Sequence, residues 1–133
     1  MILDSNNHSV LLLYYHLILV VKYRRKVFDD YMSDFAKNIF VRISQAYNIT
    51  LEQWKHDKYH VHIMFRTHPN TEISKFINTY KSASSRLIKK KYPAVRKKLM
   101  EGNVLVKEFL FTYHRRSSYR SHKTIYRKTG YKP

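Results

Sequence analysis

The spacing of apolar residues along the chain predicts the order of its strands and helices. A run rich in Leu, Val and Tyr at 9–23 predicts a long central strand. At 29–47 apolar residues recur three and four positions apart, which predicts an amphipathic helix capped by one of the aspartates at 29–30. Two β-rich runs within 49–68, separated by the polar residues 55–58, predict a hairpin.

A second amphipathic helix follows the hairpin, and Thr71 is expected to cap it. The helix should end around Pro93, and its apolar stripe comprises Ile73, Phe76, Ile77, Tyr80, Ser84, Leu87 and Ile88. An alternating run at 104–113 predicts a fourth strand, followed by a basic tail. The order β-α-β-β-α-β predicts an α+β, ferredoxin-like (split β-α-β) antiparallel sheet with helices on one face. That fold is common and does not name a function.

Composition and charge narrow the partner class. The chain has 133 residues, enough for one domain, and no cysteine, which excludes disulfides, thiolate metal sites and a thiol nucleophile. The 26 Lys and Arg residues against 9 Asp and Glu residues give a net charge of +17, which favours nucleic acid. The longest apolar run, Val10–Val21, is too short to span a bilayer and is interrupted by His16. We expect a cytoplasmic nucleic-acid-binding domain with no membrane partner.

The string YHVHIMF contains the most informative pair of residues. Side chains two apart on a strand share a face, so His60 and His62 should project together while Val61, Ile63 and Phe65 point into the core. Two imidazoles on one face can bind a divalent metal and leave positions open for a phosphate oxygen. On spacing alone, two surface histidines on a half-buried strand remain the more common case, because two ligands do not make a site.

The second predicted helix carries a cluster of cations suited to phosphate contacts. These candidate DNA-binding residues are Lys81, Arg86, Lys89, Lys90 and Lys91. A solvated helix surface is the alternative for any single lysine among them. The chain also has twelve tyrosines, and composition alone does not select a nucleophile from them.

Three strings together resemble the HUH-type single-tyrosine transposases of insertion sequences, the TnpA family. They are HSVLLLYYHLILVVKYRRKVFDD, DKYHVHIMF and ISKFINTYKSASSRLIKKKYP, and the resemblance runs from about Asn7 to Leu99. It implies a homodimeric ferredoxin-like nuclease that acts on single-stranded DNA folded into hairpins at the ends of the element. It also implies that His60 and His62 hold magnesium or manganese, which polarises the scissile phosphate. A tyrosine on a C-terminal helix would then attack, leaving a 5′-phosphotyrosine link, with a glutamine four residues later completing the metal site.

From Met100 onward the chain departs from the family pattern, which continues with a Trp-containing strand, a Thr-Thr-Gly-Gly-Ala-Pro turn and a helix carrying Tyr and Gln. Codons that can encode Met100 to Thr129 can also encode that family pattern when they are read one base later. The match extends to the family's Tyr-x-x-x-Gln. We therefore hypothesise that the C-terminal quarter is a frameshifted transposase sequence, which sequencing of the coding DNA decides. Residues 100–133 hold +6 of the +17, so the first 99 still carry +11 and the nucleic-acid argument survives.

The altered C-terminus affects the expected mechanism. Tyr126 lies almost where the family places its nucleophile, but Gly130 stands where glutamine is expected. We therefore divide the chain into a transposase-like domain, 1–112, and a basic tail, 113–133, and expect this copy to cleave poorly. The rival hypothesis is a non-catalytic single-stranded nucleic-acid-binding module of the same fold, which would expose aromatic side chains on the sheet for base stacking.

Overall fold

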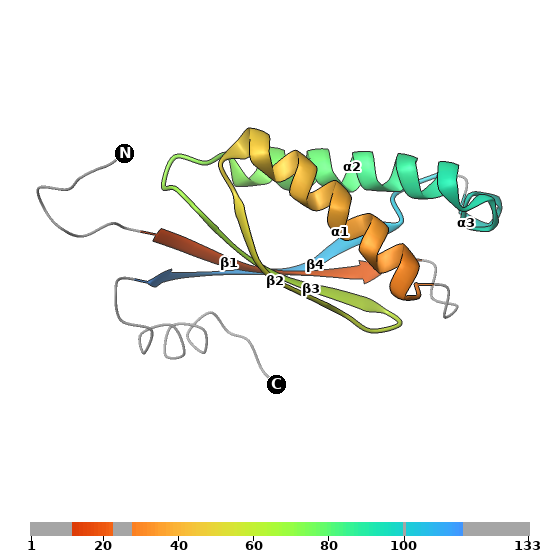
Figure 1. Ribbon diagram of the computed structural model, residues 1–133, viewed down its shortest axis with the longest axis horizontal. Coiled ribbons are helices and arrows are strands. Elements are labelled where there is room, and N and C mark those ends of the chain that lie inside the picture. Colours follow the sequence, from red (N-terminus) through yellow and green to blue (C-terminus); the bar gives the residue numbers. More distant parts are fainter. Residues whose placement is uncertain (1–11, 23–27, 100, 116–133) are drawn as a thin grey trace, which may run out of the picture.

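The computed structural model describes residues 12–22, 28–99 and 101–115, with side chains up to residue 112. In this part of the chain four antiparallel strands form one sheet in the order β2-β3-β1-β4 (Figure 1). The strands are β1 (Leu12–Val21), β2 (Thr50–His56), β3 (His60–Thr67) and β4 (Leu105–Arg115). The helices are α1 (Asp30–Ser44), the 3-10 turn η2 (Gln45–Tyr47), α2 (Ile73–Lys91) and α3 (Pro93–Lys98).

The first helix begins where the sequence predicts. The Asp29 side chain accepts a hydrogen bond from the backbone N–H of Met32 at 2.9 Å, satisfying one of the donors that a helix start leaves free. The side chains of Met32, Ile39 and Phe40 are buried on the side that faces the sheet. After η2 the chain turns at Asn48, whose φ of 56° is left-handed, and enters β2.

The second helix confirms the predicted apolar stripe but not the predicted cap. Thr71 does not cap α2, because the helix begins two residues later, at Ile73, and Glu72 occupies the cap position without a side-chain hydrogen bond. The Oγ1 atom of Thr71 is instead buried and has no hydrogen-bond partner in the described part of the chain. The helix ends before Pro93 as predicted, but that proline starts the short helix α3, which the sequence analysis did not predict.

The core lies between the sheet and the two long helices, which cover the same face in Figure 1. Phe40 of α1 is at its centre, fully buried, and its ring contacts those of Trp54, Phe65, Phe76 and Tyr80 at centroid distances of 5.1–5.9 Å. The predicted α+β, ferredoxin-like arrangement is confirmed. None of the described helices has the length and apolar character needed to cross a membrane.

The two faces of the sheet differ. Val61, Ile63 and Phe65 of β3 are fully buried against the helices, as predicted. The alternate residues of β3 point to the other face, on which no described helix lies (Figure 1). We call this second side the open face.

Candidate metal and nucleic-acid site on the open sheet face

His60 and His62 project together from the open face, as predicted. In the register between β1 and β3 they lie opposite Val20 and Ile18, and their ring centroids are 6.1 Å apart. Both residues are partly exposed. Because β3 has a neighbour on each side, the two imidazoles stand on an interior strand whose backbone is fixed by two ladders of hydrogen bonds.

A third imidazole adjoins the pair. The ring of His16, from β1, lies with its centroid 5.8 Å from that of His62. His16 is buried, and burial, with a smaller contribution from the charge of His62, lowers the pKa of His16 to about 4. The ring is therefore uncharged at neutral pH. In the sequence His16 is only a break in an apolar run, because its place beside His62 depends on the β1–β3 register.

An irregularity in β4 brings a carboxylate to the imidazoles. Lys107 pairs with Leu19 and Phe109 with Ile18, so Glu108 is an extra residue in the ladder. Its Oε1 atom lies 3.2 Å from Nε2 of His60. Glu108 has no signal of its own in the sequence, because the position of a bulge depends on the pairing of strands far apart in the sequence.

A second carboxylate approaches His60 from the β2–β3 turn. Asp57 Oδ1 accepts hydrogen bonds from the backbone N–H groups of Tyr59 and His60, at 2.8 and 2.7 Å, and lies 3.6 Å from His60 Nδ1. Burial by itself would raise the pKa of Asp57, but these backbone donors and the nearby imidazoles outweigh it and lower the pKa. The turn is thus fixed by the same carboxylate that faces the ring.

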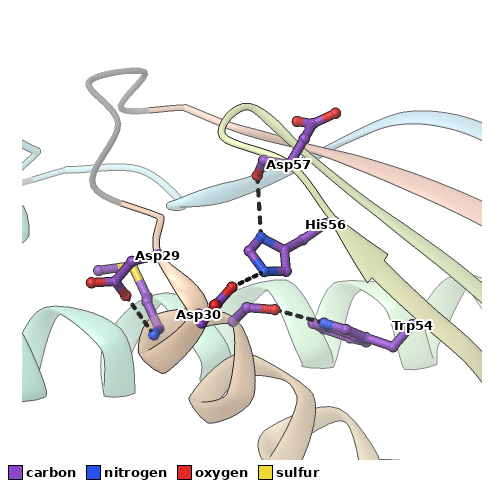
Figure 2. A network of polar contacts seen from close by, with 7 residues as sticks. Asp29, Asp30, Trp54, His56 and Asp57 are labelled. Atoms are coloured by element: carbon purple, nitrogen blue, oxygen red, sulfur yellow. Dashed lines mark hydrogen bonds and ion pairs between the residues drawn. The ribbon is translucent and has the colours of Figure 1, made fainter.

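Polar contacts anchor this hairpin to α1 (Figure 2). Asp30 Oδ1 lies 2.9 Å from Nε2 of His56, and the indole N–H of Trp54 donates to the hydroxyl of Ser33 at 2.9 Å. Both contacts join β2 to the first turn of the helix. The strand that precedes the turn, and with it the start of β3, is held against the helical layer.

The donor atoms on the open face suit a divalent cation only in part. In the described part of the chain no three His, Asp or Glu side chains are arranged to hold a metal ion. The 3.2 Å between His60 Nε2 and Glu108 Oε1 nevertheless matches the separation of about 3 Å between two ligands at right angles on a cation with bonds of about 2.1 Å. Imidazole nitrogen and carboxylate oxygen are also donors that such ions accept.

The predicted DNA-binding cations lie on the other side of the sheet. They belong to α2, on the covered face, so the structure does not bring them together with the imidazoles. Arg86, Lys89 and Lys90 line a hollow of about 400 Å³ with Pro93 and Arg96. The ammonium group of Lys89 donates to the carbonyl of Gly102 at 2.7 Å, and that of Lys91 lies 5.0 Å from the ring centroid of Phe35. Lys81 lies one to two turns before this hollow.

Some of the predicted residues lie outside the described part of the chain. Tyr126 and Gly130 are among them, as is most of the expected tail, 113–133. The backbone of β4 continues to Arg115, three residues past the expected boundary. The shifted frame concerns the coding DNA and stays a prediction.

Comparison with known protein families shows to which family the chain belongs. The family model described as IS200-like transposase matches residues 9–124. The chain belongs to this transposase family. The resemblance expected from the three sequence strings is thereby confirmed.

Individual relatives agree with the family assignment. The chain is 33% identical, over 90 residues, to the ISDra2 transposase TnpA of Deinococcus radiodurans; the match covers 68% of this chain and 64%, less than two thirds, of that protein. A crystal structure of a Deinococcus radiodurans R1 protein assigned as a transposase superposes with a TM-score of 0.64 at 24% identity, covering 92% of this chain and 93% of that one. A REP-associated tyrosine transposase bound to a REP hairpin gives a TM-score of 0.54 at 7% identity, over 85% of this chain and 61% of that one. At these identities the two structures support the fold.

Proposed function

We propose that this transposase binds the single-stranded hairpin ends of an insertion sequence and cleaves and rejoins the DNA through a tyrosine. Family membership over residues 9–124 gives the reaction class. The observation that carries the proposal is the placement of His60 and His62 on one accessible face of an interior strand. The net charge of +17 supplies the attraction to a polyanion.

His60 and His62 are the proposed holders of magnesium or manganese, with Glu108 beside them. The bound cation would polarise the scissile phosphate. Asp57 fixes the backbone at the start of β3 through its hydrogen bond from the His60 N–H, and its carboxylate places a negative charge 3.6 Å from Nδ1 of His60, beyond hydrogen-bond distance. His16, uncharged and buried, packs against His62 and limits its movement.

Tyr126 is the proposed nucleophile. Its hydroxyl oxygen would form the bond to phosphorus and lose its proton, while the bond to the 3′ oxygen breaks and that oxygen takes up a proton. The strand would then be left with a free 3′ hydroxyl and a 5′-phosphotyrosine link. Gly130 offers no side chain four residues later, and the tail sequence has no apolar helical stripe that would dock the tyrosine. Because attack requires a held geometry, we expect slow cleavage.

A cleavage and binding assay with labelled oligonucleotides from both ends of the element tests the proposal. We expect weak, manganese- or magnesium-dependent cleavage that the His60→Ala/His62→Ala variant abolishes, while its salt-sensitive binding stays close to that of the parent. Cleavage that persists in the double variant, or in EDTA, would contradict the role of the imidazoles. Binding with no cleavage under any condition would favour the non-catalytic module. Robust covalent attachment that Tyr126→Phe removes would contradict the impairment.

The family resemblance also supports a homodimer. Light scattering coupled to size-exclusion chromatography should give twice the mass of one chain. A monomer at micromolar concentration would contradict this part of the proposal.

A further inference from the structure

A continuous row of aromatic rings crosses the open face. Phe109 and Phe111 of β4 stack on each other, with ring centroids 5.8 Å apart and planes inclined by 9°. Phe111 lies 5.9 Å from the ring of His16, and His16 lies 5.8 Å from that of His62. The row therefore runs from the edge strand to the imidazole pair over three strands.

The two ends of this row differ in exposure. Phe111 and His16 are buried, at 6% and 9% relative exposure, whereas Phe109 is 49% exposed. Single exposed apolar residues are ordinary on protein surfaces. Phe109 differs from such a residue because its ring is fixed by stacking on Phe111 and because it shares a face with the proposed cleavage residues.

The register places Phe109 close to the imidazoles. Phe109 lies opposite Ile18, and Ile18 lies opposite His62, so all three point to the open face. Two strand spacings separate Phe109 from His62, a distance of about 10 Å. A group held on Phe109 and a phosphate held at His62 can thus belong to neighbouring parts of one strand.

We propose that Phe109, supported by Phe111, is a stacking platform for an unpaired base of the single-stranded DNA beside the scissile phosphate. This inference rests on the proposed function for the identity of its ligand. An unpaired base offers the flat π face that an exposed phenyl ring binds, and stacking does not depend on base identity. The overall charge of the chain favours the polyanion, and Lys55, opposite His62 in the ladder, adds an exposed cation on the same face.

Anisotropy titrations with single-stranded element-end oligonucleotides, in EDTA so that no cleavage occurs, test the platform. Phe109→Ala should weaken binding by about 5- to 150-fold, the range that corresponds to 1–3 kcal/mol per stacked base, and Phe109→Trp should restore it. Tyr31→Ala is the matched control, because Tyr31 is an even more exposed aromatic residue (80%) but belongs to α1, on the covered side. Its affinity should equal that of the parent.

A thermodynamic cycle that combines Phe109→Ala with an abasic oligonucleotide separates a loss of base stacking from a loss of protein stability. Removing the one base that stacks on Phe109 should weaken binding to the parent but leave binding to Phe109→Ala unchanged. Parent-like affinity in Phe109→Ala overturns the platform. So does an equal loss for every oligonucleotide together with a lower melting temperature that Phe109→Trp does not restore, because Phe109 would then pack against the chain itself.

The outcomes also separate the platform from the proposed function. Metal-dependent cleavage that needs His60 and His62, combined with normal binding by Phe109→Ala, would overturn the platform alone. A stacking defect without any imidazole-dependent cleavage would support the platform and contradict the proposed function.

Discussion

The carboxylate of Glu108 lies 3.2 Å from Nε2 of His60, although the two residues belong to strands that do not pair with each other. β1 lies between β3 and β4, and the bulge in β4 directs the Glu108 side chain over β1 toward His60. The negative charge therefore stands next to the nitrogen that the proposed cation would use. Neither residue's sequence neighbourhood indicates this contact.

Glu108→Gln should weaken manganese binding by about tenfold or more, because it removes a negative charge beside the ligand nitrogen. Isothermal titration calorimetry, or the electron paramagnetic resonance signal of free manganese, measures the change. Glu52→Gln is the matched control: Glu52 is also the extra residue of a bulge and is similarly exposed (36% against 37%), but its carboxylate pairs with Arg66 at 2.8 Å. Unchanged or tighter binding in Glu108→Gln would show that the carboxylate does not help hold the cation.

Arg86→Ala/Lys90→Ala should weaken DNA binding in a salt-dependent way. If each side chain neutralises one phosphate, the slope of log affinity against log salt concentration should fall by about 1.4, at about 0.7 per contact on a single strand. Titrations across a range of salt concentrations measure the slope. Lys75→Ala, at the opposite end of α2 and beside Glu72, should leave it unchanged. An unaltered slope in the double variant would mean that the hollow between α2 and α3 does not contact the strand.

Tyr80→Phe should change the pH dependence of stability. Tyr80 is fully buried and donates to the carbonyl of Ala36 at 2.9 Å, and burial raises the pKa of its hydroxyl. At pH 8 the parent should be more stable by about 1 kcal/mol. Above pH 10 only the unfolded tyrosine ionises, so the contribution of Tyr80 is lost as the pH rises, by about 1.4 kcal/mol at pH 11. Urea unfolding of both proteins at pH 8, 10 and 11 measures the difference; a constant difference would contradict the assignment.

Phe40→Ala should lower the free energy of unfolding by about 3–5 kcal/mol, because it leaves a cavity among four aromatic rings. Chemical denaturation followed by far-ultraviolet circular dichroism measures the loss. Val41→Ala, the exposed neighbour on the same helix, should change stability by less than about 0.5 kcal/mol. Similar losses in the two variants would show that Phe40 is not the centre of the core.

Local patterns were sufficient to predict the elements and one side of the site. The strict alternation of β3 placed His60 and His62 on one face, because only that phase buries Val61, Ile63 and Phe65. The apolar stripes of the two long helices were also predicted from local spacing, because residues three and four apart lie on the one helix face that packs on the core. The Thr71 cap was wrong because a cap depends on where the first helical turn closes, and two neighbouring residues compete for that position.

The remainder of the site depends on pairing between distant strands. His16 meets His62 only through the β1–β3 register, and Glu108 meets His60 only through the bulge in β4. The separation of the α2 cations from the imidazoles likewise depends on which face of the sheet the helix covers. The sequence does not indicate that the two groups lie on opposite sides of the sheet. The sequence indicated the chemistry, and the topology determined which groups share a face.

The single extra residue in β4 also sets the parity of everything that follows it. Val106 points to the open face, and strict alternation would send residue 108 there and residue 109 inward. Because the ladder skips Glu108, that carboxylate and the next ring, Phe109, emerge on the same side, while Leu110 turns inward to the core. Deleting Glu108 would therefore leave a regular ladder in which Phe109 and Phe111 keep the open face and Leu110 keeps the core, so that the open face would lose the carboxylate alone.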